Sequence, residues 1–192
     1  MRALLSRDLS ASVVVDGLTI SSIDRGLLVL VGVGTCDTVD DVRWLAAKLL
    51  NARLWESGEG GRAWSKSVVS LSLPLLLVSQ FTLHGSLRRP QPDFHHAAKA
   101  RDARLLFDSL VATLRKTHGE DAVKTGAFAE MMQVASVNDG PVTLWLDSHN
   151  REGIFFENEQ EGVVADSEVK KPDQRLDLRG VADSDTKVKG DE

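Results

Sequence analysis

The sequence of 192 residues lacks most of the motifs by which enzymes are commonly recognised. It contains no G-x-x-x-x-G-K-[ST] phosphate-binding loop, no spacing of ligand residues typical of a metal site, and no Ser-His-Asp order that can be read from the sequence. Cys36 is the only cysteine, so no intrachain disulfide can form. We therefore predict no metal and no other cofactor. We expect function to depend on the backbone N–H and carbonyl groups that the fold presents.

Long apolar runs are absent as well. The longest, residues 27–33 and 73–78, have the length of strands, and the N-terminal residues alternate instead of forming the apolar segment of a signal peptide. These absences predict a cytoplasmic protein that makes no contact with a membrane. A content of 42% hydrophobic residues is enough for one domain with a sizeable core.

Acidic charge is concentrated in the last part of the chain. Residues 1–148 carry 16 Lys and Arg and 16 Asp and Glu, whereas residues 149–192 carry 7 and 12, so the net charge of −5 belongs to the second segment. That segment has one compact apolar group, Ile154-Phe155-Phe156, and we expect it to be a disordered acidic tail after a domain over residues 1–148. A neutral domain argues against broad non-specific binding of nucleic acid but allows a local basic patch.

The apolar patterns predict both helices and strands. Helical periodicity indicates helices over residues 40–54 and 97–118, the first of which should cover one face of a sheet. Thr38 followed by Asp41 is a capping-box signal for the start of the first helix. Strands are expected at residues 2–6 and 11–15, separated by a polar break, and at 18–23, 27–33, 73–78, 123–125, 132–137 and 142–146.

Two short polar segments stand out against this pattern. Ser79-Gln80-Phe81-Thr82-Leu83 follows a buried strand and can present backbone N–H groups from a turn. Asn138-Asp139-Gly140-Pro141-Val142-Thr143 joins two strands and can present carbonyl groups from a Gly-Pro corner. Between them lies a proline-stiffened loop with Arg88, Arg89 and Phe94, a combination that suits phosphate contact and base stacking. A solvated loop with Phe94 packed into the core is the alternative interpretation.

Taken together, these segments resemble the D-aminoacyl-tRNA deacylases, also called D-tyrosyl-tRNA deacylases. Each piece is weak alone, but their order and spacing are highly specific, and the resemblance covers about residues 1–148. The segments that carry it are Met1-Arg2-Ala3-Leu4, residues 11–17, residues 26–33, Ser79 to Leu83, Pro92-Asp93-Phe94-His95, Met132-Gln133-Val134 and Asn138 to Thr143.

The resemblance implies a compact α+β fold with a mixed or antiparallel sheet curved around the two main helices. It also implies a homodimer with two active sites at the subunit interface. It implies a cis Gly140–Pro141 bond whose corner enters the partner's pocket, beside that partner's Ser79 to Thr82 segment. The carbonyls of Gly140 and Pro141 would hold the substrate's α-amino group, and Arg7 matches the arginine that steadies this corner. The other corner residues are Asn138, Val142 and Thr143.

The reaction implied is hydrolysis of the ester that joins a D-amino acid to the terminal adenosine of tRNA. An ester is already activated, so a positioned water and backbone N–H groups around Phe81 and Thr82 are sufficient for it. No general base stands beside Thr82 in the sequence, which favours an orienting role over a nucleophilic one. Together with Ser79 and Gln80, these residues form the predicted catalytic segment. The expected contacts with the 3′ end of the tRNA are Phe94, Met132, Arg88 and Arg89.

Selectivity in this scheme works by exclusion. With the amino group and the ester fixed, an L side chain would meet the Gly-Pro wall, whereas a D side chain would point to solvent. The scheme predicts tolerance of many side chains in chiral proofreading during translation. It also predicts acceptance of glycine, including glycine mischarged on alanine tRNA.

Four residues depart from the family pattern. Ser6 stands where glutamine is common, Asp8 where an apolar residue is usual, and Ala129 and Glu130 where a glycine and then a small or polar residue are usual. The resemblance places the last two near the substrate pocket, in the segment from which adenosine contacts are expected.

Two alternatives remain. One is a relative with a trans Gly-Pro corner that removes L-alanine from tRNA, against which the intact residues 79–83 and Arg7 argue. The other is a non-catalytic nucleic-acid-binding protein that keeps the same fold, with the acidic tail as a partner-binding segment.

Overall fold

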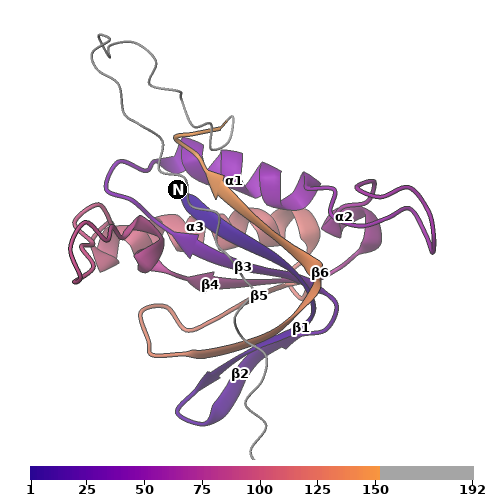
Figure 1. The fold of residues 1–192 in the computed structure, drawn as a ribbon, viewed down its shortest axis with the longest axis horizontal. Coiled ribbons are helices and arrows are strands. Elements are labelled where there is room, and N and C mark those ends of the chain that lie inside the picture. Colours follow the sequence, from indigo (N-terminus) through magenta and orange to yellow (C-terminus); the bar gives the residue numbers. More distant parts are fainter. Residues whose placement is uncertain (152–192) are drawn as a thin grey trace, which may run out of the picture. The chain divides into compact units, whose positions relative to one another are not determined.

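The computed structural model describes residues 1–151, all within the first of two units into which the chain divides, Met1–Phe155. The predicted acidic tail therefore lies outside the described residues except for its first three. Figure 1 shows a sheet with helices along one of its faces. The elements are β1 (Arg2–Val15), β2 (Leu18–Ile23), β3 (Gly26–Gly32), α1 (Val39–Asn51), α2 (Val68–Leu71), β4 (Leu75–Ser79), the 3₁₀ turn η1 (Phe81–His84), α3 (Ala100–His118), β5 (Val123–Thr125) and β6 (Gln133–Asp147).

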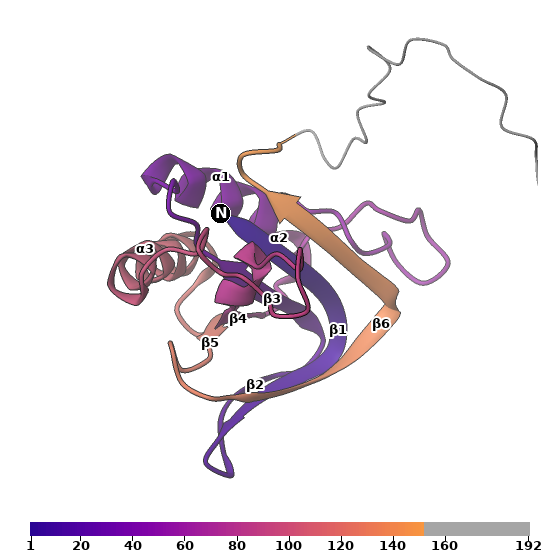
Figure 2. The ribbon, with the colours of Figure 1, turned by 60° about the vertical axis from the view of Figure 1, so that its left-hand side comes forward.

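The sheet has six strands and mixed pairing. Its order is β2-β1-β3-β4-β5, and β6 pairs with β1 off this path. β1 is antiparallel to β2, β3 and β6, whereas β3, β4 and β5 run parallel to one another. The long strands β1 and β6 bend together, and the sheet curves nearly into a barrel (Figure 2).

β1 is one continuous strand, so the predicted break between residues 6 and 11 is wrong. Its pairing with β6 shifts register on both sides of Asp8, and the strand passes through the polar stretch as a bulged ribbon. Ala3 and Leu5 belong to the core under the helices, while Ala11 and Val13 belong to a second cluster. The irregular register thus lets one strand serve two cores.

β6 is likewise continuous, although two strands separated by a corner were predicted. Gly140 and Pro141 lie within it, opposite the irregular part of β1. Both errors have one cause, because cross-strand hydrogen bonds carry the two backbones through residues that locally favour a turn.

The two predicted helices are confirmed but are shorter than expected. α1 ends at Asn51, three residues before the predicted end. α3 begins at Ala100 because the backbone before it is hydrogen-bonded to another segment. The N–H of Ala98 donates to the Val33 carbonyl at 2.9 Å. The capping signal at the start of α1 is confirmed, since the N–H and hydroxyl of Thr38 donate to Asp41 Oδ2 at 2.8 and 2.9 Å.

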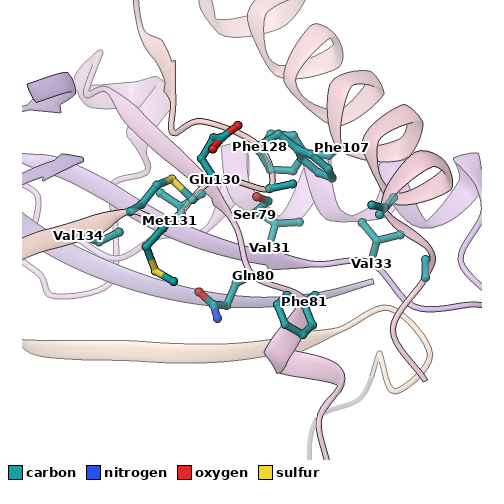
Figure 3. A pocket seen from close by; sticks show the side chains of 16 residues that line it. Val31, Val33, Ser79, Gln80, Phe81, Phe107, Phe128, Glu130, Met131 and Val134 are labelled. Carbon is teal, nitrogen blue, oxygen red and sulfur yellow. The ribbon is translucent and has the colours of Figure 1, made fainter. Parts of the chain in front are cut away.

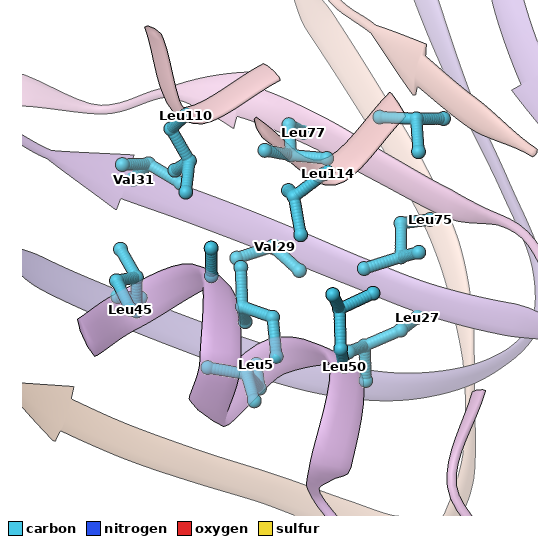
Figure 4. Packing of buried hydrophobic residues seen from close by; sticks show 14 of the residues in the cluster. Leu5, Leu27, Val29, Val31, Leu45, Leu50, Leu75, Leu77, Leu110 and Leu114 are labelled. Carbon is cyan, nitrogen blue, oxygen red and sulfur yellow. The ribbon is translucent and has the colours of Figure 1, made fainter. Parts of the chain in front are cut away.

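Leucine stripes from both helices fill the main core (Figure 4). Each buried leucine contributes roughly 1.5 to 3 kcal/mol relative to an exposed one. A second cluster on the opposite face includes Leu28 and Leu76, so β3 and β4 are buried on both faces, which is typical of strands with continuous apolar runs. Among residues 1–151, no helix has the length and apolar character needed to cross a membrane. The main-core residues that carry the packing are Leu5, Val29, Leu45, Leu49, Leu77, Leu110 and Leu114.

Candidate active site

The Ser79 to Leu83 segment leaves the sheet as a tight 3₁₀ turn. The Gln80 N–H donates to the Val31 carbonyl at 2.7 Å, and the Gly85 N–H donates to the Thr82 carbonyl at 2.9 Å. Gly32 allows this close approach, because a Cβ there would lie 2.9 Å from the Gln80 carbonyl oxygen. The turn is therefore held against the end of β3 by its backbone.

This turn forms one wall of a pocket of about 570 Å³ (Figure 3). Apolar side chains predominate in the lining, and Glu130 is its single charged residue. A mostly apolar cavity with a few polar groups at fixed positions suits a small organic ligand. The lining residues include Ser79, Gln80, Phe81, Val31, Val33, Phe107, Phe128, Met131, Met132 and Val134.

Two predicted site residues lie next to the pocket without lining it. Thr82 accepts a hydrogen bond on its hydroxyl from the Gln80 side-chain amide, the one side-chain hydrogen bond that Thr82 makes within residues 1–151. Phe94 packs edge-on against Phe81 with ring centroids 5.0 Å apart. Phe81 itself is 58% exposed, so the aromatic pair forms a partly open rim.

The second predicted segment forms a separate corner on β6. The Gly140–Pro141 peptide bond is cis, as the resemblance implied. Arg7 Nε donates to the Asp139 carbonyl at 3.1 Å and pairs with the Asp139 carboxylate, while its Nη1 donates to the Leu54 carbonyl at 2.6 Å. Arg7 thus ties the start of the corner to the segment that follows α1.

Asn138 ties the two ends of the corner together. Its Oδ1 accepts from the Val142 N–H at 2.8 Å, and its Nδ2 donates to Thr143 Oγ1 at 2.8 Å. The same Nδ2 donates to Ser6 Oγ on β1 at 2.6 Å. The structure therefore brings Arg7 together with the predicted corner residues.

The corner does not meet the pocket within one chain. In residues 1–151, no residue from 138 to 143 lines the pocket, and Gly140 and Pro141 are exposed. Arg88 lines another cavity of about 550 Å³ with Arg2 and His84, and Arg89 is exposed on the same loop. Burial and the nearby charge of Arg2 lower the pKa of His84.

The family model described as D-Tyr-tRNA(Tyr) deacylase matches residues 4–147. The chain belongs to this deacylase family. A D-aminoacyl-tRNA deacylase of Yarrowia lipolytica is 45% identical over 152 residues, which cover 78% of this chain and 99% of the relative. D-aminoacyl-tRNA deacylase 1 of Homo sapiens is 43% identical over 148 residues, which cover 77% of this chain and 70% of the relative. The relatives bear the names of hydrolases that act on ester bonds.

Solved structures agree with this family assignment. One described as a c-Myc DNA unwinding element binding protein is 42% identical, with a TM-score of 0.73 over 77% of this chain and 98% of that one. Another, described as a probable eukaryotic D-amino acid tRNA deacylase, is 18% identical with a TM-score of 0.65 over 76% of this chain and 97% of that one. At that identity the second likeness concerns the fold alone.

Sequence reasoning missed several residues that line the pocket. Phe107 lies in the predicted helix over residues 97–118, and it is both buried and part of the lining, with Phe128 beside it at 5.6 Å between ring centroids. Tertiary packing brings these rings to the pocket, and no local motif marks them. Ala129 and Glu130, noted as departures from the family pattern, do line the pocket, and Ala129 has a positive φ of 63°.

Among residues 1–151, one group has the character of metal ligands, formed by Asp37, Asp41 and His149. The α-amino group of Met1 already donates to Asp37 Oδ1 at 2.5 Å, and His149 Nε2 lies 2.8 Å from the same oxygen. Burial raises the pKa of Asp41, but hydrogen bonds from Ser148 and Thr38 outweigh it and lower the pKa to about 2. Ion pairs and hydrogen bonds within the chain thus account for this group.

Proposed function

We propose that this protein hydrolyses the ester bond of D-aminoacyl-tRNA, releases the free D-amino acid and tRNA, and so acts in chiral proofreading during cytoplasmic translation. One observation carries the proposal. A pocket walled by residues 79–81 and a corner held by Arg7 and Asn138 occur together in a chain of the deacylase family.

We propose further that the protein works as a homodimer in which each corner enters the partner's pocket. The exposed position of Gly140 and Pro141, away from the pocket of their own chain, supports this arrangement. The same strand exposes large apolar side chains, a feature of surfaces that become covered by a partner. These residues on β6 are Val134, Val137 and Leu144.

In this mechanism, water adds to the ester carbonyl carbon and the bond from that carbon to the ribose oxygen breaks. The proton lost by the water passes to the ribose oxygen, which leaves as a hydroxyl. Phe81 and Thr82 open η1, so their N–H groups have no partner from within that turn and are available to the developing oxyanion. Loss of one such donor costs roughly 100- to 1000-fold in rate in a well-studied case.

Each further part of the substrate is assigned to a group of residues. The apolar pocket, with Met132, takes the terminal adenosine, and the Phe81–Phe94 rim and Arg88 with Arg89 take the strand that precedes it. The Gly140 and Pro141 carbonyls of the partner take the α-amino group, which leaves D side chains in solvent and glycine unhindered. Thr82 orients the substrate or the turn.

The direct test is release of labelled amino acid from D-tyrosyl-tRNA and L-tyrosyl-tRNA in parallel, with and without EDTA. We expect fast release of D-tyrosine, negligible release of L-tyrosine and no effect of the chelator. Preferential release of L-tyrosine would overturn the assignment of the corner, and dependence on the chelated metal would overturn the backbone mechanism.

A second candidate function is binding of duplex DNA, favoured by the description of the 42% identical solved structure as a DNA unwinding element binding protein. A gel shift on duplex DNA across a salt series distinguishes the two, because phosphate contacts weaken steeply with salt. A salt-dependent shift with no release from either tyrosyl-tRNA would favour the binding protein.

A further inference from the structure

Asp8 is a buried carboxyl group that the mechanism above does not use. It lies on β1 between Gly26 of β3 and Asn138 of β6, and it is 0% exposed. Its Oδ1 accepts a hydrogen bond from Ser6 Oγ at 2.5 Å, whereas its Oδ2 has no partner among the described residues. A buried polar atom without a partner costs stability, so this residue calls for a role beyond packing.

The hydrogen bonds that begin at Asp8 have a fixed direction. A serine hydroxyl has one proton, and Ser6 gives it to Asp8. Ser6 Oγ must then act as the acceptor toward Asn138, whose Nδ2 lies 2.6 Å away. The Asn138 amide is therefore oriented with nitrogen toward Ser6 and oxygen toward the Val142 N–H.

Loss of the acceptor at position 8 would release this orientation. The Ser6 hydroxyl would be free to donate to the Asn138 amide oxygen, and the amide could rotate by half a turn to receive it. Its Nδ2 would then face the Val142 N–H, which places two donors together and leaves the residue after Pro141 without its hydrogen bond.

We propose that Asp8 is a positioning residue that fixes the Asn138 amide through Ser6 and thereby the second half of the Gly-Pro corner. This inference rests on the proposed function of the corner. Arg7 holds the first half through the Asp139 carbonyl, so three consecutive residues of β1 fix both halves. Side chains alternate along a strand, which places Ser6 and Asp8 on one face and Arg7 on the other.

Two substitutions at position 8 distinguish the effect of the hydrogen-bond acceptor on Asp8 from the effect of the size and shape of its side chain. Asp8→Asn keeps an acceptor oxygen, so we expect release of D-tyrosine within about twofold of the unchanged protein. Asp8→Leu removes the acceptor at similar size, so we expect release of D-tyrosine, and its ratio to release of L-tyrosine, each to fall roughly tenfold, as for one hydrogen bond. Asp16→Asn, at an exposed turn residue, is the matched control for a charge change.

The ratio of D to L release is the deciding measurement, because a variant that merely folds less completely loses both activities in proportion. An unchanged ratio in Asp8→Leu would overturn the proposal. A fall in Asp8→Asn as large as that in Asp8→Leu would overturn it too, since the acceptor would then be irrelevant.

If Asp8→Leu fails to fold, substitutions at position 6 test the same series of hydrogen bonds. Ser6→Ala breaks the link, while Ser6→Thr keeps the hydroxyl on a residue that strands accept well. We expect faster amide hydrogen exchange at Val142 in Ser6→Ala and near-normal exchange in Ser6→Thr. Equal exchange in the two variants would contradict the proposal. This readout needs no substrate, so it stands even if the unchanged protein proves not to be a deacylase.

Discussion

Single residues at the corner have little freedom to change. Gly140 has a φ of +126°, and a Cβ there would lie 2.9 Å from Arg7 Nη2 and 2.8 Å from Val142 Cγ2. The glycine is thus required both by the backbone conformation and by the two side chains that enclose the corner.

Gly140→Ala should therefore lose activity beyond its cost in stability. We expect the free energy of unfolding to fall by about 1 to 2 kcal/mol from the backbone alone, and release of D-tyrosine to fall about 100-fold from displacement of the corner. Gly58→Ala is a matched control, because Gly58 has a φ of +137° with no atom within 4 Å of the added Cβ. Equal loss of activity in both variants would show that stability, and not the corner, is responsible.

Asp8 should make stability depend on pH. Burial raises the pKa of the Asp8 carboxyl, and the hydrogen bond from Ser6 only partly offsets this, so protonation of Asp8 is easier in the folded chain than in the unfolded one. The associated stability is complete below the unfolded pKa of 3.8 and is lost as pH rises through the folded pKa.

Asp8→Asn removes this titration. In urea titrations, the free energy of unfolding of the variant should therefore rise relative to that of the unchanged protein as pH increases from about 3.5 to 8. A difference between the two proteins that does not change with pH would contradict the raised pKa of Asp8.

At the scale of elements, the start of α1 depends on Asp41. Its carboxylate accepts from Thr38 and Ser148, which holds its pKa at about 2, against 3.8 in an unfolded chain. The associated stability is present above pH 3.8 and is lost as pH falls through about 2.

Asp41→Asn should lower the free energy of unfolding by about 2 kcal/mol at pH 7, and the difference should shrink as pH falls toward 2. The neighbouring Asp40→Asn is the control. Within residues 1–151 Asp40 makes only an exposed pair with Arg43, so this substitution should change stability by less than about 1 kcal/mol. Equal effects of the two substitutions in urea unfolding would exclude a special role for Asp41.

The sequence predicted where strands and helices exist better than where they join. Every predicted strand is present, because each follows a local apolar pattern, but the joins at residues 6–11 and 137–142 are continuous in β1 and β6. Their continuity comes from pairing between strands more than 100 residues apart, which no local pattern contains. Residues 79–81 and Met132 belong to local motifs, so the sequence was enough to find them. Phe107 and Phe128 were missed because only tertiary packing brings their rings to the pocket.

At the scale of the whole molecule, the account needs two chains for one site. The pocket and the corner are each well formed in the described residues, yet they are apart within one chain. A homodimer with twofold symmetry would join each pocket to the partner's corner and produce two identical sites.

Mixing two inactive variants tests this central claim most directly. Pro141→Ala alters the corner alone, and Phe81→Pro alters the pocket alone because proline lacks the backbone N–H assigned to the oxyanion. A heterodimer of the two therefore contains one intact pocket facing one intact corner. If the chains are co-refolded in equal amounts, half of the dimers are mixed, and we predict release of D-tyrosine at about a quarter of the unchanged rate. Each variant refolded by itself should stay inactive. If mixed dimers form and the mixture still releases no D-tyrosine, the site is not built from two chains.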